Sequence, residues 1–197
     1  QELKVAGDLD VSRGSVREAL LILERRHLIL IYPRKGAVVS ALTADLVNSL
    51  YDIYIHLLLM LVDKLMDRST QSNLQPILQS VSEFRRRINA PDATIEEVIE
   101  GGMSVMRQCY PIVNNPYLEE TLENFRPAIS RTYYLALERD REETRLTDEF
   151  FASIGESVQA NDREGVAKAI RRFGEHQRRV ALDALEKDES LSREVAN

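Results

Sequence analysis

The segment Val11–Leu20, with the sequence VSRGSVREAL, constrains the fold of this chain more than any other segment. Its apolar residues recur at helical spacing and continue into the next turn, at Val16, Ala19, Leu20 and Leu23. Its leading end carries hydroxyl and guanidinium groups instead, at Ser12, Arg13, Ser15 and Arg17. Ser15 with Glu18 fits a capping box, and Ser12 could equally serve as the N-cap. The pattern predicts an amphipathic helix with a polar, cationic N-terminal end.

Two predicted strands and a basic turn follow this helix. Leu28–Tyr32 is rich in β-branched and aliphatic residues, Pro33–Gly36 is a basic turn, and Ala37–Val39 is a returning strand. Upstream, Val5–Asp10 fits a short helix and a turn. A helix-turn-helix followed by a hairpin with a basic tip predicts a winged helix, whose second helix enters the major groove of DNA. Arginine suits this position because its planar fork grips phosphate or the edge of guanine.

The residues of both motifs carry a resemblance to a known family. S-R-x-x-V-R-E-A-L in the helix and P-x-K-G-A-x-V in the hairpin resemble the GntR family of bacterial transcription regulators. The resemblance implies contacts with double-stranded operator DNA from Ser12, Arg13, Ser15, Arg17, Arg34, Lys35 and Gly36. It also implies that the first helix of the family precedes Gln1, so residues 1–41 are expected to form an incomplete winged helix. The alternative is an unrelated amphipathic helix and hairpin with solvated arginines.

The distribution of charge supports a division of the chain. The net charge of −6 looks wrong for a protein that binds nucleic acid. Residues 1–40 hold seven basic against five acidic residues, a net charge of +2, whereas residues 41–197 hold 19 against 27, a net charge of −8. The bases of the first part cluster at the helix end and the wing tip, where phosphates would lie. DNA contact is therefore expected from the N-terminal part alone.

From Thr43 onward, apolar residues recur at helical spacing and strand signals stop. We expect helices at about 43–68, 74–87, 95–113, from 116, at 143–160 and from 162. Asn115–Pro116 is a restart with an N-cap and a proline at the first helical position, and Pro127 predicts a kink near residues 123–127. The helix after this restart carries an apolar stripe at Leu118, Leu122, Phe125, Ile129 and Tyr133. The chain is thus expected to be mainly α, with an all-α bundle of six to seven helices over 43–197.

The longest apolar run and the single cysteine limit the class of protein. Ile53–Val62 spans ten residues, too few to cross a bilayer, and favours burial in a bundle core or a dimer seam together with His56. Cys109 is the only cysteine, which excludes an internal disulfide and a thiolate metal cluster. We recognise no signal peptide, and a cytoplasmic location is expected.

The helical half also resembles a known domain. VNNPYLEETL, and Gln159–Asp162 followed by VAKAI, are similar to segments of the FCD domain in the FadR-like subfamily of GntR regulators. The resemblance implies that residues 43–197 bind a small-molecule effector and form a homodimer. Behind a GntR-like winged helix, this order of domains is typical of a metabolite-responsive regulator.

Many FCD domains bind a divalent metal through an aspartate, a histidine four residues later and two further histidines. Matching this pattern to the chain places Glu100, Ser104, Phe151 and Phe173 at the four positions. One acid and one hydroxyl cannot hold a transition metal tightly, so we expect no metal cofactor. The remaining histidines are interpreted as structural, with His27 at a helix C-terminus and His176 one turn after Phe173.

Without the metal, an anionic effector would need arginines, and Arg107 and Arg131 are the candidates. The expected effector pocket consists of Tyr54, Glu100, Ser104, Arg107, Arg131, Tyr134, Phe151 and Phe173. Relatives without the metal residues include sensors of acyl-coenzyme A, so a fatty acid, an acyl thioester or an aromatic acid is implied. The alternative is that these aromatic residues are packed core.

The sequence therefore favours a metabolite-responsive repressor that acts as a homodimer on a palindromic operator and is released by a small organic acid or acyl-type effector. We find no nucleophile with a base and no phosphate-binding loop that would indicate an enzyme. A ligand-binding or dimerisation module without effective DNA binding is the alternative, because Leu3 stands where many relatives carry a DNA-contacting arginine.

Overall fold

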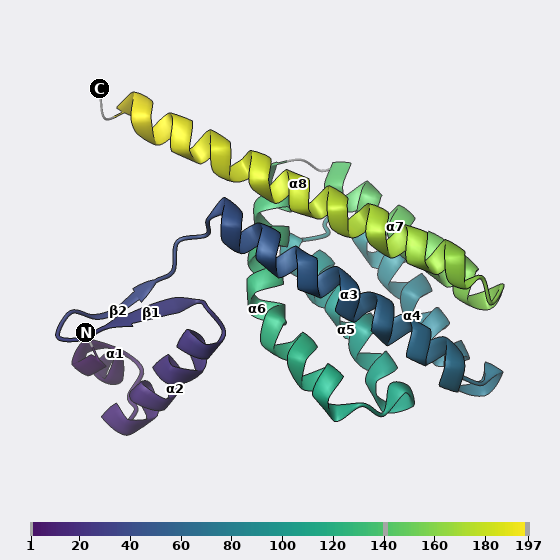
Figure 1. The fold of residues 1–197 in the computed structure, drawn as a ribbon, viewed down its shortest axis with the longest axis horizontal. Coiled ribbons are helices and arrows are strands. Elements are labelled where there is room, and N and C mark those ends of the chain that lie inside the picture. Colours follow the sequence, from purple (N-terminus) through teal and green to yellow (C-terminus); the bar gives the residue numbers. More distant parts are fainter. Residues whose placement is uncertain (1, 140–141, 196–197) are drawn as a thin grey trace. The chain divides into compact units, whose positions relative to one another are not determined.

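The computed structural model describes residues 2–139 and 142–195 and divides into two compact units, residues 1–43 and 44–197. The first unit contains two short helices and a two-stranded sheet, and the second contains six helices within the described residues (Figure 1). The mainly α fold with a winged helix-turn-helix is confirmed.

The first unit is built around the helix that the sequence pattern predicts. Helix α1 spans Glu2–Asp8, α2 spans Arg13–Arg25, and strands β1 (Ile29–Tyr32) and β2 (Gly36–Val39) pair in antiparallel register, Ile29 opposite Val39. Ala6, Val16 and Ile29 are buried where α1, α2 and β1 pack. A carboxylate oxygen of Glu24 accepts a hydrogen bond of 3.1 Å from the Ile31 amide and ties the hairpin to α2.

The N-cap of α2 is Ser12. Its side chain accepts a 3.0 Å hydrogen bond from the backbone N–H of Ser15, which satisfies one donor of the first helical turn. Of the two caps that the sequence allowed, the structure therefore contains the Ser12 cap. At the other end, His27 has a φ of +57° and follows the C-cap Arg26, which agrees with its expected place at the helix C-terminus.

The second unit is an all-α bundle of α3 (Ala44–Arg68), α4 (Gln71–Ile88), α5 (Ile95–Val113), α6 (Pro116–Arg139), α7 (Glu142–Gln159) and α8 (Arg163–Val195). Helix α8 packs along α3 and α7, and α5 lies against α3, α4 and α6 (Figure 1). The predicted restart is confirmed: Asn114 ends α5 with a φ of +46°, and the Asn115 side chain accepts from the Leu118 amide at the start of α6. Pro127, at which a kink is predicted, lies within α6, and this helix continues past the proline to Arg139.

The apolar run of α3 is buried on one side only. Tyr51, Tyr54 and Leu61 lie in the core, whereas Leu46, Ile53 and Met60 are 45%, 50% and 46% exposed. His56 is exposed in the single chain, with Nδ1 2.7 Å from the carbonyl oxygen of Asp52, so its placement in the bundle core is wrong. Within the described residues, α3 alone has the length and composition of a membrane span, which is weak evidence because core helices of soluble proteins share both properties.

Candidate functional site

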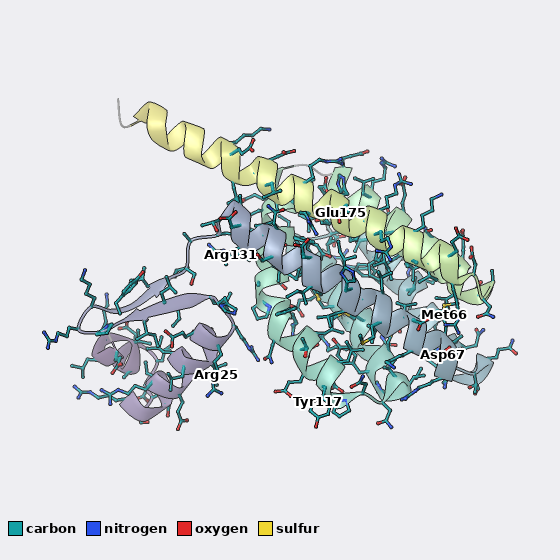
Figure 2. All side chains as sticks on the ribbon, viewed as in Figure 1. Arg25, Met66, Asp67, Tyr117, Arg131 and Glu175 are labelled. Carbon is teal, nitrogen blue, oxygen red and sulfur yellow. The ribbon has the colours of Figure 1, made fainter. Side chains whose placement is uncertain are left out.

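The N-terminal end of α2 presents the predicted polar residues together at the surface. Ser12, Arg13, Ser15 and Arg17 are all exposed. The hydroxyls of Ser12 and Ser15 lie 2.9 Å apart, and Nε of Arg17 donates to Glu2 in α1 over 2.8 Å. The Arg17 side chain is 68% exposed, so this ion pair leaves most of the guanidinium open to solvent. Arg25 lies at the opposite end of the same helix (Figure 2).

The hairpin places two further cations at its tip. Arg34 and Lys35 are exposed in the turn between β1 and β2, and the Lys35 amide donates to the carbonyl oxygen of Tyr32. Arg34 and Gly36 have φ values of +65° and +91°, a conformation that Gly36 adopts without steric cost because it lacks a Cβ. The turn thus holds both basic side chains on a short, well-defined loop.

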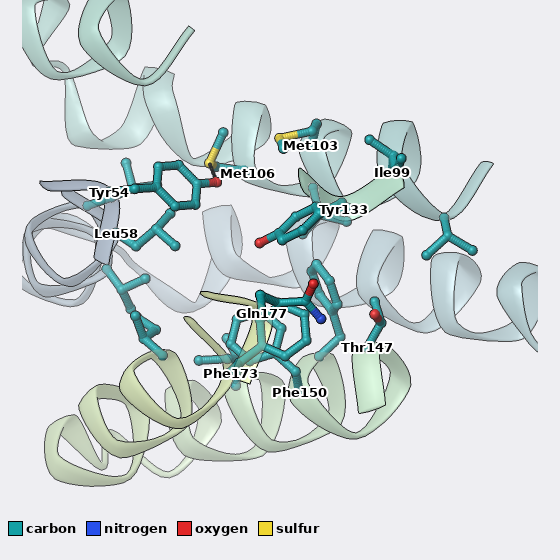
Figure 3. A pocket seen from close by; sticks show the side chains of 18 of the residues that line it. Tyr54, Leu58, Ile99, Met103, Met106, Tyr133, Thr147, Phe150, Phe173 and Gln177 are labelled. Atoms are coloured by element: carbon teal, nitrogen blue, oxygen red, sulfur yellow. Dashed lines mark hydrogen bonds between the residues drawn. The ribbon is translucent and has the colours of Figure 1, made fainter. Parts of the chain in front are cut away.

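The second unit contains a cavity of about 130 Å³ lined by α3, α5, α6, α7 and α8 (Figure 3). Most of its wall consists of aliphatic, methionine and phenylalanine side chains. The rings of Phe150 and Phe173 stack at 4.3 Å, and Phe151 meets Phe84 edge-on at 4.8 Å. These contacts between rings of α4, α7 and α8 fix the shape of one wall.

Few polar groups reach this cavity. The Tyr54 hydroxyl donates to the sulfur of Met106 over 3.9 Å, and the Thr147 hydroxyl donates to the backbone oxygen of Glu143. The Tyr133 hydroxyl points into the cavity, and no described residue accepts from it or donates to it (Figure 3). Desolvation raises the pKa of both Tyr54 and Tyr133 above the ordinary value, so both phenols are neutral.

The amide of Gln177 is held at the cavity wall by a buried polar cluster of α7 and α8. Its Nε2 donates to a carboxylate oxygen of Glu143 over 3.0 Å, and the same carboxylate contacts Nε2 of His176 at 2.9 Å. Arg179 donates to Nδ1 of His176, which fixes the ring with Nδ1 as acceptor and Nε2 as donor. His176 therefore binds Glu143 from outside the cavity wall and does not line the cavity.

The predicted pocket requires a correction on α5. Glu100, Ser104 and Arg107 do not line the cavity; they border a separate surface groove. Gly102 and Met106 face the cavity instead, and a Cβ on Gly102 would lie 3.4 Å from the ring of Phe151. Glu100, Ser104 and Arg107 therefore lie on a different face of α5 from the residues that line the cavity.

Arg131 and Tyr134 also lie outside the cavity, beside Glu96 and Glu100 at a surface depression between α5 and α6. The carboxylate of Glu100 accepts from Nη2 of Arg126 at 2.7 Å, which lowers the Glu100 pKa. Of the eight predicted pocket residues, Tyr54, Phe151 and Phe173 line the cavity. The expectation that arginines share this cavity with the aromatic residues is therefore wrong.

The cavity wall does not fit a metal ion. The side chains of α5 that line the cavity are aliphatic apart from two thioethers and the single thiol of Cys109, and a thioether is a weak ligand for a divalent ion. Within the described part of the chain, no group of three or more His, Cys, Asp or Glu side chains is placed to hold a metal.

Residues 49–176 match the family model of the FCD domain. The chain belongs to the FCD regulators of the GntR family. It is 26% identical over 171 residues to the uncharacterized HTH-type transcriptional regulator YdhC of Bacillus subtilis, covering 86% of this chain and 75% of that protein. This FCD regulator is a transcription factor with a helix-turn-helix domain, not an enzyme.

Two solved structures share the fold of this FCD regulator. McbR/YncC of E. coli superposes with a TM-score of 0.76 at 20% identity, covering 92% of this chain and 85% of that one. A putative GntR regulator from Rhodococcus sp. RHA1 superposes with a TM-score of 0.68 at 18% identity, covering 93% and 86%. At these identities the likeness concerns the fold alone.

Sequence reasoning missed Tyr133 and Gln177 as polar residues of the cavity in this FCD regulator. Tyr133 lies at the end of the predicted apolar stripe of α6, and Gln177 follows Phe173 by one helical turn. The signal in the sequence that could have indicated Tyr133 is its position as the last residue of a stripe that is otherwise apolar. Gln177 and Glu143 carry no comparable signal, because they lie on different helices and are 34 residues apart in the sequence.

Proposed function

We propose that this protein is a repressor that binds a palindromic operator as a homodimer and is released when a small molecule occupies the cavity of the FCD domain. The observation that carries this proposal is the pairing of an exposed cationic helix end with a largely apolar cavity in one chain. A ligand alters DNA affinity only if it binds the DNA-competent and the released states with different affinity.

On DNA, the N-terminal end of α2 would enter the major groove. Arg13 and Arg17 share one helix face at i and i+4, and both would contact base edges or phosphates. Ser12 and Ser15 are short enough to allow close approach, and their hydroxyls and the first helical amides suit a phosphate oxygen. Arg34 and Lys35, with Gly36 completing the turn, would contact the backbone or the minor groove from the wing.

The homodimer would use the exposed apolar face of α3. Leu46, Ile53 and Met60 follow one another at intervals of seven residues and are about half exposed in the single chain. A self-complementary apolar stripe suits a two-fold interface, and a two-fold dimer matches a palindromic operator. We also propose a cytoplasmic location, where the operator DNA is found.

The effector would be small and largely apolar. The cavity volume of about 130 Å³ resembles that of a dry, apolar protein cavity of about 150 Å³ that binds benzene. Of the effectors implied by the resemblance, the aromatic ring or a short acyl group fits this volume, whereas a long acyl chain requires the bundle to open. We propose that this protein binds no metal cofactor.

The test is binding of the full-length protein to DNA from the region upstream of its own gene, at increasing salt. Six to ten phosphate contacts would lower the affinity by about 10³- to 10⁵-fold between 50 and 200 mM salt. A flat salt dependence, or equal weak binding to every fragment, would favour the module without effective DNA binding.

A further inference from the structure

We infer that the cavity selects an uncharged, ring-sized molecule that carries a hydroxyl or N–H group, and that Tyr133 and Gln177 bind this polar group. The inference rests on the proposed function only in taking the cavity as the effector site. It specifies the chemistry of the effector and excludes ionised carboxylates, which the sequence had favoured.

The first step is to identify which atoms of Tyr133 and Gln177 can form a hydrogen bond with a ligand. The amide nitrogen of Gln177 is committed to Glu143, since a carboxylate can only accept while it is ionised. Its amide oxygen is therefore the atom that can accept from a ligand, and no described contact occupies it. The Tyr133 hydroxyl points into the same space without a partner among the described residues (Figure 3). A ligand with one donor and one acceptor at the same atom, such as a phenol, can satisfy both.

The second step is the absence of a counter-ion. The described residues that line the cavity include no Lys, Arg, Asp or Glu. The charged group that contacts the wall is the carboxylate of Glu143 behind Gln177, which repels an anion. Arg107 and Arg131 belong to surface sites. Transfer of an ionised carboxylate into such an apolar site without a cation is strongly unfavourable.

The third step is the fixed position of the amide. Gln177 is buried, and Glu143, itself buried, holds the amide while being held by His176. The cluster is anchored on its outer side by the contact of Arg179 with His176. The polar group of the ligand thus meets a preorganised acceptor, which favours discrimination between ligands that carry the donor and ligands that lack it.

Three probes of similar size separate these effects: phenol, toluene and benzoate, titrated into the full-length protein by calorimetry near neutral pH. Phenol is expected to bind about twofold to tenfold more tightly than toluene, because its hydrogen bonds with Tyr133 and Gln177 replace hydrogen bonds with water and the net gain is modest. Benzoate is ionised at this pH and is expected to show no binding at concentrations that saturate the site with phenol.

Two variants assign the polar group. Tyr133→Phe should reduce the phenol affinity toward that of toluene without weakening toluene binding, and Gln177→Met should act in the same direction. Tyr110→Phe is the matched control, since its hydroxyl donates to Glu123 and Tyr110 does not line the cavity. Circular dichroism and melting curves identify any variant that fails to fold, and the other variant then carries the test.

The inference is overturned if benzoate binds as tightly as phenol, if the folded variants keep the full preference for phenol, or if none of the probes binds. None of these outcomes depends on DNA. A flat salt dependence of DNA binding would instead reject the proposed function and leave the probe affinities standing.

Discussion

Two arginine side chains of α2, Arg13 and Arg17, differ in the ion pairs that they form in the DNA-free protein. Arg17 is paired with Glu2 from the neighbouring helix, whereas Arg13 begins α2 with no ion-pair partner among the described contacts. To reach a phosphate, Arg17 has to exchange one anion for another. The exchange costs little, because an exposed ion pair contributes less than about 1 kcal/mol.

Arg13→Ala and Arg17→Ala are each expected to weaken operator binding without unfolding the protein, because both side chains are exposed. Loss of a base contact should cost about 1–3 kcal/mol and relax specificity at one position, whereas loss of a phosphate contact should weaken binding to all sequences and flatten the salt dependence. We expect the second behaviour for Arg34→Ala and Lys35→Ala. Fluorescence anisotropy with operator and scrambled duplexes at several salt concentrations distinguishes the two.

Arg25→Ala serves as the control for these variants, because Arg25 is exposed at the far end of α2. If Arg13→Ala and Arg17→Ala both bind the operator like the unaltered protein, the assignment of the DNA-contacting surface is wrong.

Among the helices, α5 illustrates what a sequence pattern can determine. Its predicted bounds agree with the structure, because Thr94 and Glu97 form a capping box at one end and Asn114 ends it at the other. Its rotation could not be predicted, because apolar residues occupy more than one of its faces, with Val98 and Val105 on one face and Ile99 and Met103 on the next. The rotation is set by packing against neighbouring helices, because a Cβ on Gly101 would clash with the Phe84 ring of α4.

The same limit applies to the cavity. The tyrosine of α6 and the glutamine of α8 become one polar site only when five helices assemble around it. The motifs of α2 and the hairpin, by contrast, are local in sequence, and the structure places their polar residues together at the surface.

The contact between α5 and α6 through Glu100 and Arg126 gives a pH-dependent prediction. Arg126 lowers the pKa of Glu100 in the folded state, so the pair contributes stability above the ordinary pKa of a glutamate and loses it as the pH falls through the lower, folded value. Glu100→Gln should therefore lower the free energy of unfolding by at most about 1 kcal/mol near neutral pH, because Glu100 is about half exposed.

Urea unfolding at neutral pH and below about pH 4 measures this effect, and the difference between variant and unaltered protein should close in acid. Glu120→Gln, an exposed position of α6, is the control. A difference that persists undiminished in acid would show that the loss comes from packing and not from charge.

At the scale of the whole molecule, the exposed apolar face of α3, formed by Leu46, Ile53 and Met60, predicts a homodimer. Ile53→Glu should convert the proposed homodimer to monomer, because a carboxylate on each side of a two-fold axis buries two like charges. Light scattering coupled to gel filtration measures the mass. Tyr117→Glu alters an 81% exposed aromatic residue at the start of α6 and should leave the mass unchanged. A dimer that survives Ile53→Glu would place the interface on another face.

The cavity makes a prediction about metals for the molecule as purified. Zinc or nickel should not raise the melting temperature, as an ion that binds only the native state would, because glycine, methionine and phenylalanine face the cavity where ligands would be needed. Elemental analysis after washing with chelator is the direct measurement. About one zinc per chain would contradict the expectation and would direct attention to His176 and Glu143.

The single cysteine can report when the bundle opens. Cys109 lines the cavity, and burial raises the pKa of its thiol to about 12, so the reactive thiolate is scarce while Cys109 is buried in the bundle. With no second thiol in the chain, the rate of labelling by a small thiol reagent measures the frequency of opening. Phenol should slow this reaction, and Tyr133→Phe should raise the phenol concentration needed for half of this protection by up to about tenfold. Equal labelling rates with and without phenol would mean that the probe does not enter the space that Cys109 faces.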